Sequence, residues 1–159
     1  LEQFGGSTGG YGKSEEAAVF KNNDCQYISA PIICYESIYG AYVGTYKQKG
    51  ANLLAIITND GWWGNTSGHK QHVQYAALRA IETRTWVARS ANTGISAVID
   101  PLGNIVAQKG WNEKAVIKYS IPTKSTLTFY AKYGDWLYLI FSSFAVLLFI
   151  QGIYKRFKK

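Results

Sequence analysis

The chain has 159 residues, which is enough for one domain with its own hydrophobic core. Its net charge of +7 is unevenly spread, since four basic residues at 155–159 leave only +3 for residues 1–135. No basic run interleaved with stacking aromatics occurs in that part, so we expect no nucleic-acid partner. Because residue 1 is Leu and Met is absent, the chain is expected to be a fragment or a processed product.

The first elements in chain order carry little chemistry. Residues 5–12 are rich in glycine but lack a preceding strand and a Lys-Ser/Thr ending, so they predict a linker or mobile loop rather than a phosphate loop. An apolar patch at 17–20 is compatible with a short strand. Cys25 lies just beyond it and could in principle pair with Cys34, so the cysteine count leaves the redox compartment open.

The joint at Cys34 is the most informative point of the chain. Residues 27–33 form an apolar run that predicts a strand, in which Pro31 indicates an edge or irregular pairing. Residues 37–49 predict a helix that Gly50 closes. A thiol where a strand turns into a helix is the arrangement of a nucleophile elbow, because the first helical N–H groups favour negative charge there. The alternative is a buried strand cysteine, since free Cys is among the most buried residue types.

A second strand and a loop follow. Residues 53–57 are apolar without alternation, which predicts a strand covered on both faces. The polar and aromatic loop at 58–65 then stands at the carboxyl end of that strand, where sites collect in open α/β sheets. Its candidate substrate-contacting residues are Asn59, Trp62 and Trp63. We expect at least one indole to lie near Cys34 and to be exposed, the alternative being that both fill the core.

Residues 68–83 predict an amphipathic helix with two stripes. The first stripe is apolar, follows the i, i+3, i+4 pattern and should face the core: Val73, Ala76, Ala77, Ala80 and Ile81. The second stripe is polar: His72, Tyr75, Arg79 and Glu82. We expect the polar stripe to be a solvated face with an Arg79–Glu82 pair, and a buried network that supports a site is the alternative.

The next segments predict a meander. Residues 86–89 and 95–99 read as strands joined by the turn at 92–94. The turn at 100–103, of type I, then leads into a strand at 104–108, and residues 115–121 predict a further strand. Strands that alternate with helices up to Glu82, followed by a meander, predict the α/β class.

The composition changes after Asp135. Residues 136–154 carry no charge and would span roughly 28 Å as a helix, close to the hydrocarbon thickness of a bilayer. The basic residues follow this segment. Aromatic residues, which are common at membrane interfaces, stand near both of its ends: Trp136, Tyr138, Tyr154 and Phe157. We expect a transmembrane helix at 135–154 with a basic cytoplasmic tail at 155–159, which leaves residues 1–134 on the extracytoplasmic side. A buried core helix is the alternative.

Several separated motifs resemble one family. They are Ile33-Cys34-Tyr35-Glu36, the run from Thr58 to Gly64, His72-x-Gln74 with Arg79-Ala80-Ile81-Glu82, and Asn92-Thr93-Gly94-Ile95. In this order they resemble the C-terminal half of the nitrilase-like domain of apolipoprotein N-acyltransferases, and the segment after Asp135 is similar to that family's last transmembrane helix. The resemblance implies that residues 1–134 form part of an αββα sandwich. It also implies that the protein is anchored in the bacterial inner membrane, with this catalytic domain on the periplasmic or extracytoplasmic side.

The resemblance also implies a chemistry. Cys34 matches the nucleophile of a Glu-Lys-Cys triad, the Tyr35 N–H an oxyanion donor, and Glu36 a supporting residue of the active site. An acyl chain would pass from a phospholipid to the cysteine, and then to the N-terminal amino group of an apolipoprotein's diacylglyceryl cysteine, without cofactor or metal. The family's general-base Glu and its Lys lie upstream of the elbow in motifs absent here. None of the early charged residues is assigned to these roles: Glu2, Lys13, Glu15, Glu16 and Lys21.

Two other functions stay open on the sequence. One is a nitrilase-like amidase of the soluble type that is anchored in the membrane by one helix, and the terminal apolar segment counts against an ordinary soluble hydrolase. The other is a non-catalytic extracytoplasmic binding domain, against which the cysteine elbow and the tryptophan-rich loop count. We expect the isolated chain to lack activity if its base lies upstream.

Overall fold

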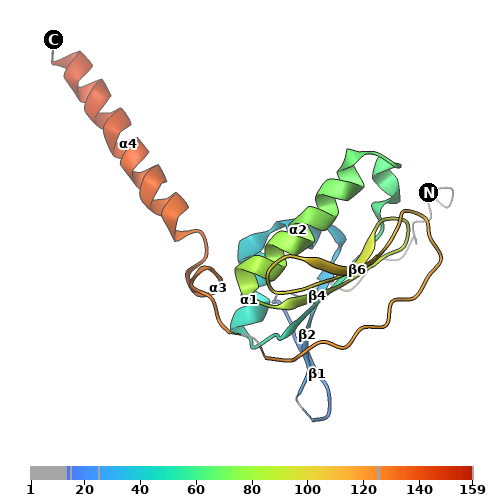
Figure 1. Cartoon of the computed structure of the whole chain (residues 1–159). Helices are drawn as coiled ribbons and strands as arrows, with labels where there is room; N and C mark the ends of the chain where they lie inside the picture. Colours follow the sequence, from blue (N-terminus) through green and yellow to red (C-terminus); the bar gives the residue numbers. More distant parts are fainter. Residues whose placement is uncertain (1–13, 15, 25, 125, 159) are drawn as a thin grey trace.

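The computed structural model describes residues 14, 16–24, 26–124 and 126–158. The glycine-rich stretch, Cys25 and the early charged residues Glu2, Lys13 and Glu15 lie outside this part of the chain. The centre of the described domain is a six-stranded sheet whose strands lie side by side in chain order (Figure 1). The strands are β1 (Phe20–Lys21), β2 (Ile28–Ile33), β3 (Leu53–Thr58), β4 (Trp86–Ala91), β5 (Ser96–Ile99) and β6 (Ile105–Lys109).

The sheet is mixed, as the predicted order of elements requires. Strands β2, β3 and β4 run parallel, so the two connections between them are crossovers, whereas β1, β5 and β6 are antiparallel to their neighbours. The predicted turn at 100–103 joins β5 to β6 and is confirmed by a hydrogen bond of 2.9 Å from the Gly103 N–H to the Asp100 carbonyl. Pro31 lies beyond the two residues of β2 that pair with β1, at the outer edge of the described sheet, as expected.

Helices fill both crossovers and cover one face of the sheet. The first crossover holds the 3₁₀ helix η2 (Cys34–Ile38) and α1 (Gly40–Gln48), and the second holds η3 (Asp60–Trp63) and α2 (Ser67–Thr83). Right-handed crossovers in one direction put α1 and α2 on the same side, where Val43 and Val73 pack against the fully buried Ile32 and Ile56. Each such side chain contributes about 1.5–3 kcal/mol to folding.

The helix predicted at 37–49 begins three residues late. Tyr39 has extended backbone angles, φ −86° and ψ 95°, and therefore separates η2 from α1. The end of α1 is as predicted, because Gly50 adopts φ +91° and its N–H donates to the Lys47 carbonyl.

The opposite face of the sheet is only half covered by the described residues. Ile33 and Ile57 are 53% and 55% exposed, whereas their neighbours Ile32 and Ile56 are fully buried. The prediction that both faces of β3 are covered is therefore wrong for this part of the chain. Side chains alternate across a strand, and helices cover only one of its two faces here. The described residues thus form one helical layer and one sheet of the expected αββα sandwich.

The strand predicted at 115–121 does not form. In Figure 1 the chain between β6 and α3 crosses the molecule without pairing into the sheet. Ala115 and Ile117 line a shallow pocket together with Ala88 and Val98, so this segment lies against the face of β4 and β5 rather than beside an edge strand. It therefore has no ladder partner, although its alternating composition resembles that of a strand.

Helix α2 confirms the predicted apolar stripe, with one exception. Val73, Ala76 and Ala80 are at most 2% exposed. Ile81 is 40% exposed, contrary to the prediction, because it lies at the margin of the buried face and its side chain reaches the Gly103 turn.

The polar stripe of α2 is not the solvated face that was expected. His72 and Arg79 are only 2% and 4% exposed, whereas Tyr75 is 40% exposed. The Arg79–Glu82 pair forms at 3.1 Å. Burial raises the pKa of the Glu82 carboxyl, even though the Arg79 charge favours its ionised form. The alternative of a buried polar stripe thus holds for His72 and Arg79 and in part for Glu82, whereas Tyr75 stays exposed.

The last two helices differ sharply in burial. Helix α3 (Phe129–Tyr133) docks on the domain through buried Ala131, whose carbonyl accepts a hydrogen bond of 2.7 Å from Gln48 Nε2. Helix α4 (Trp136–Phe157) buries none of its residues and projects away from the domain in Figure 1. Within the described ranges it is the one helix long and apolar enough to cross a membrane.

Candidate active site

Cys34 occupies a strained turn between β2 and α1. Its φ of +50° is in the left-handed region, which costs a residue other than glycine about 1–3 kcal/mol and persists only where the surroundings impose it. Two side chains from η2 impose it here. Glu36 Oε2 accepts a hydrogen bond of 2.7 Å from the Ile33 N–H, and Ser37 Oγ donates one of 2.8 Å to the Cys34 carbonyl. The predicted elbow geometry is confirmed, and Cys34 is a partly exposed free thiol rather than a buried strand cysteine.

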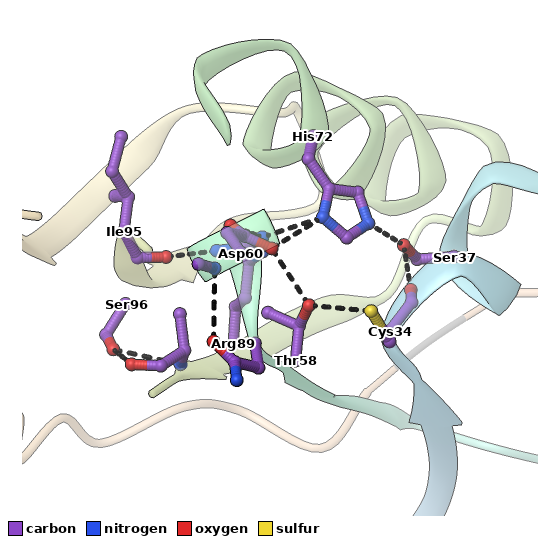
Figure 2. A network of polar contacts seen from close by, with 11 residues as sticks. Cys34, Ser37, Thr58, Asp60, His72, Arg89, Ile95 and Ser96 are labelled. Carbon is purple, nitrogen blue, oxygen red and sulfur yellow. Dashed lines mark hydrogen bonds and ion pairs between the residues drawn. The ribbon is translucent and has the colours of Figure 1, made fainter. Parts of the chain in front are cut away.

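The sulfur of Cys34 points toward the end of β3, as Figure 2 shows. Its hydrogen-bond partner there is Thr58 Oγ1, at 3.1 Å. The same hydroxyl lies 2.9 Å from Asp60 Oδ1. Thr58 therefore connects the thiol to a carboxylate that is fully buried.

Asp60 is the centre of a buried polar network. Its Oδ1 faces His72 Nδ1 at 2.9 Å, and its Oδ2 accepts a hydrogen bond of 2.7 Å from Arg89 Nη2. Burial opposes ionisation of this carboxyl, but the hydrogen bonds from His72, Arg89 and Thr58 and the Arg89 charge outweigh it and hold its pKa at about 2. Asp60 is thus an ionised acceptor at neutral pH, as a buried carboxylate paired with a guanidinium should be.

His72 extends this network back to the elbow. Its Nε2 lies 3.0 Å from Ser37 Oγ, which in turn donates to the Cys34 carbonyl. The imidazole in Figure 2 stands between Asp60 and Ser37. Cys34 is therefore held at two points, at its sulfur through Thr58 and at its carbonyl through Ser37, and both connections lead to Asp60.

The turn after β4 completes the network. Arg89 also donates to the Ile95 carbonyl, which fixes the guanidinium against the β4–β5 connection. A Cβ placed on Gly94 would lie 2.1 Å from Asp60 Oδ2, so only glycine leaves room for the carboxylate at this position. The motif at 92–95 therefore serves to enclose Asp60.

The predicted site residues gather around the elbow to different degrees. Tyr35 is in the first turn of η2, where backbone N–H groups have no helical partner. Its half-exposed ring contacts Trp63, which in turn packs against His72 with ring centroids 5.2 Å apart. Trp62 is 75% exposed and does not fill the core, and Asn59 accepts a hydrogen bond of 3.1 Å from the Gly61 N–H to begin η3.

Tyr35, Trp63 and His72 also line a pocket beside the elbow. Its volume is about 190 Å³. The remaining lining residues come from η2 and α2: Ile38, Gly68, Gln71 and Tyr75.

Sequence reasoning missed Thr58, Asp60 and Arg89 as members of the site. A signal existed for Asp60, because an acidic residue directly after a buried strand has to find a cationic partner. Nothing local marks Arg89, which is on an ordinary-looking strand and meets Asp60 only because β3 and β4 are neighbours. Glu16, one of the charged residues considered early, pairs with Lys49 at 2.9 Å on the surface and not with the elbow.

No cluster of three or more His, Cys, Asp or Glu side chains that could hold a metal ion occurs within the described ranges.

Comparison with known proteins identifies relatives over most of the chain. Residues 7–128 match the carbon–nitrogen hydrolase family. The chain is 37% identical to the apolipoprotein N-acyltransferase of Chlorobaculum tepidum over 150 residues, which is 92% of this chain and 28% of that protein. It is 42% identical to that of Bradyrhizobium diazoefficiens over 122 residues, 76% of this chain and 22% of that protein. The resemblance to apolipoprotein N-acyltransferases is therefore confirmed, and the match spans about a quarter of the length of these relatives.

Solved structures give the same fold. A nitrilase-superfamily protein from Saccharomyces cerevisiae aligns with a TM-score of 0.53 at 22% identity, over 65% of this chain and 40% of that one. An amidase from Nesterenkonia sp., with acrylamide added at its active-site cysteine, aligns with a TM-score of 0.51 at 19% identity, over 62% of this chain and 40% of that one. The nitrilase-like fold expected from the sequence is therefore confirmed.

Proposed function

The chain belongs to the carbon–nitrogen hydrolase family, and on this premise we propose that it carries the nucleophile of an N-acyltransferase that acts on lipoproteins. The substrates would be a phospholipid acyl donor and an apolipoprotein whose N-terminal diacylglyceryl cysteine offers a free amino group. The observation that carries the proposal is Cys34, a free and partly exposed thiol at a strained strand-to-helix turn. The similarity to apolipoprotein N-acyltransferases supports the choice of reaction.

The reaction would proceed in two steps. In the first, the Cys34 thiolate attacks the ester carbonyl of the phospholipid, the lysophospholipid alcohol leaves with a proton, and a thioester forms. In the second, the amino group attacks the thioester carbonyl, an amide forms, and the thiolate is released as the amine loses its proton. The Tyr35 N–H, in the first turn of η2, would donate to the oxyanion of either tetrahedral intermediate.

Glu36 has a positioning role in this scheme. One of its carboxylate oxygens holds the Ile33 N–H, so it keeps Cys34 in the left-handed conformation that presents the sulfur. The general-base Glu and the Lys that the resemblance implies are not assigned to any residue of this chain.

The bilayer is the proposed location of α4. A helix of 22 residues spans about 33 Å, which matches the hydrocarbon core, and none of its side chains is buried against the domain. Phe129 and Tyr133 in α3 are exposed and form an aromatic cluster with Trp136 at the start of α4, where interfacial aromatics are found. Lys155 and Arg156 in its last turn favour a cytoplasmic C-terminus, with the catalytic part on the extracytoplasmic side of a bacterial inner membrane.

Trp62 is the proposed contact for lipid. It follows the strand that carries Thr58, and 75% of its surface is exposed to solvent. In the native protein, Trp62→Ala should lower the rate of acyl transfer to the acceptor and leave the unfolding midpoint of the enzyme unchanged. A loss of stability without a loss of transfer would show instead that the indole has a packing role.

Mass spectrometry of the native, membrane-embedded protein tests the chemistry. After incubation with a phospholipid, the peptide that contains Cys34 should gain the mass of one acyl chain, and the adduct should disappear when an acceptor peptide with a free amino terminus is added. Cys34→Ser should abolish turnover or trap an oxyester, because a hydroxyl is a far weaker nucleophile. Cys25→Ser is the control and should keep the adduct. Full activity of Cys34→Ser, or an adduct on Cys25, would end the proposal.

Accessibility labelling tests the topology separately. Cysteines introduced at Asp135 and Lys155 in a background without native cysteines should react with an impermeant maleimide from opposite sides of the membrane. Labelling of both positions from one side would show that α4 does not cross.

A further inference from the structure

The environment of the Cys34 sulfur contains a hydroxyl with two possible acceptors. Thr58 Oγ1 lies 3.1 Å from the sulfur and 2.9 Å from Asp60 Oδ1, yet a hydroxyl carries a single proton. While Cys34 is a thiol, its S–H can donate to Thr58, and Thr58 then donates to Asp60. Once the thiol proton is lost, the Thr58 hydroxyl can donate its proton in a hydrogen bond to the sulfur.

The charges around Asp60 make this exchange feasible. An isolated carboxylate so close to the sulfur would keep the hydroxyl proton and repel a second negative charge. Asp60 has two further partners, however, since Arg89 Nη2 and His72 Nδ1 lie 2.7 Å and 2.9 Å from its two oxygens. Because these two contacts remain, the carboxylate can lose the hydrogen bond from Thr58 and still be hydrogen-bonded.

The placement of Thr58 leaves little freedom. It is 5% exposed, and it is the last residue of β3, whose neighbours on both sides are the parallel strands β2 and β4. Cys34 is equally fixed, because Ser37 and Glu36 hold the turn from the other side. The sulfur and the hydroxyl are therefore preorganised and need no rearrangement beyond rotation of one O–H bond.

We propose that Thr58 is a catalytic residue whose hydroxyl stabilises the Cys34 thiolate, and that Asp60, Arg89 and His72 form a positioning network that keeps this proton available. The role as a catalytic residue rests on the proposed function, in which Cys34 is the nucleophile. When the general base takes the thiol proton, the Thr58 O–H turns from Asp60 to the sulfur. When the S–C bond forms, the negative charge moves to the carbonyl oxygen and the O–H turns back to Asp60.

Alkylation of Cys34 with iodoacetamide tests this proposal without requiring acyl transfer, because only the thiolate reacts. The rate is followed by mass spectrometry from pH 5 to 10 on the whole chain in detergent, in a Cys25→Ser background. Thr58→Val keeps the shape but removes the hydroxyl. We expect it to react about tenfold more slowly at neutral pH, which is the effect of losing one hydrogen bond to a charged group. Its profile should meet that of the parent at high pH, where the thiol is ionised in both.

Two further variants make the comparison specific. Thr58→Ser restores the hydroxyl and should recover most of the parent rate. Thr85→Val removes another fully buried hydroxyl, at the opposite end of the parallel strands, and should leave the alkylation of Cys34 unchanged. A role of Thr58 confined to folding would instead lower the unfolding midpoint while leaving the pH profile of alkylation in place.

Infrared spectroscopy of the same Cys25→Ser background provides a measurement that does not depend on a folded Thr58 variant. The Cys34 S–H stretch should be shifted to the lower frequency of a hydrogen-bonded thiol. The proposal is overturned by equal alkylation profiles of Thr58→Val and its parent, or by an S–H stretch typical of a free thiol. If the alkylation contrast appears but no acyl adduct ever forms on Cys34, the thiolate contact stands and the proposed acyltransferase function fails.

Discussion

Asp60→Asn is the substitution that most directly tests the buried network. Asparagine has the same shape and can still accept from Thr58, but it carries no charge. Arg89 would then be a buried guanidinium without a carboxylate partner, since its side chain is fully buried in the pair with Asp60. Loss of one partner of a buried ion pair typically destabilises a protein by about 3–5 kcal/mol.

The pKa of Asp60 gives a second estimate of this effect. Its shift from 3.8 to about 2 means that the folded state favours the ionised form by roughly 2–3 kcal/mol. The two estimates agree in scale, and the amide should cost somewhat more than protonation because its NH₂ group faces a cationic or N–H donor. A loss of about 3 kcal/mol is a large share of the 5–15 kcal/mol that stabilises a typical domain.

Urea unfolding in detergent, followed by tryptophan fluorescence, measures the change. Asp60→Asn should lower the midpoint by roughly 1 M or more. Glu113→Gln is the matched control, because it removes the carboxylate of a surface pair with Lys109, at 3.1 Å, and should leave the midpoint in place. An Asp60→Asn midpoint equal to that of the parent would refute the view that this carboxylate holds the site together.

Three other predictions concern Asp60, Gly94 and Lys47. Because the folded-state pKa of Asp60 lies below its ordinary value, the stability that this carboxylate contributes is present above pH 3.8 and should be lost as the pH falls toward 2. In urea titrations over that pH window, Asp60→Asn should lose less stability than the parent. Gly94→Ala should destabilise by at least as much as Asp60→Asn, since its Cβ would lie 2.1 Å from Asp60 Oδ2; an unchanged thermal midpoint would show that the turn can move aside. Lys47→Met should stabilise by about 1–3 kcal/mol at pH 7, because burial lowers the pKa of Lys47 to about 8 and charging it in the folded state is costly. The parent should gain stability as the pH rises from 8 to 10.5, and a lower midpoint for Lys47→Met would mean that the hydrogen bond of 2.9 Å from Lys47 Nζ to Thr85 dominates.

The network also explains why several distant motifs occur together. The tripeptide Asn59-Asp60-Gly61 supplies the carboxylate, His72 reaches it from α2, and Gly94 leaves space for it. Each motif is short and polar, and its chemistry is complete only when β3, β4 and α2 are assembled. The separate sequence signals are thus parts of one support for the Cys34 elbow.

The sequence by itself determined the features that depend on neighbouring residues along the chain. The elbow at Cys34 follows from an apolar run that ends where a helical pattern begins, and Gly50 ends α1 because its backbone adopts a positive φ there. The apolar face of α2 follows from its 3.6-residue period, and most of α4 follows from the uncharged, largely apolar run at 136–154. Local propensity and periodicity suffice for such elements.

Only the tertiary structure decided which faces are covered. The stripe with His72 and Arg79 reads as a solvated face in one dimension, and it is buried because η2, β4 and α3 close over it. Residues 115–121 have the composition of a strand, but a strand also needs an unpaired edge beside it, and this segment lies on a face. Asp60 and Arg89 are 29 residues apart and meet because parallel strands bring their carboxyl ends together. Burial and pairing between distant segments are properties of the assembled sheet, and no local pattern encodes them.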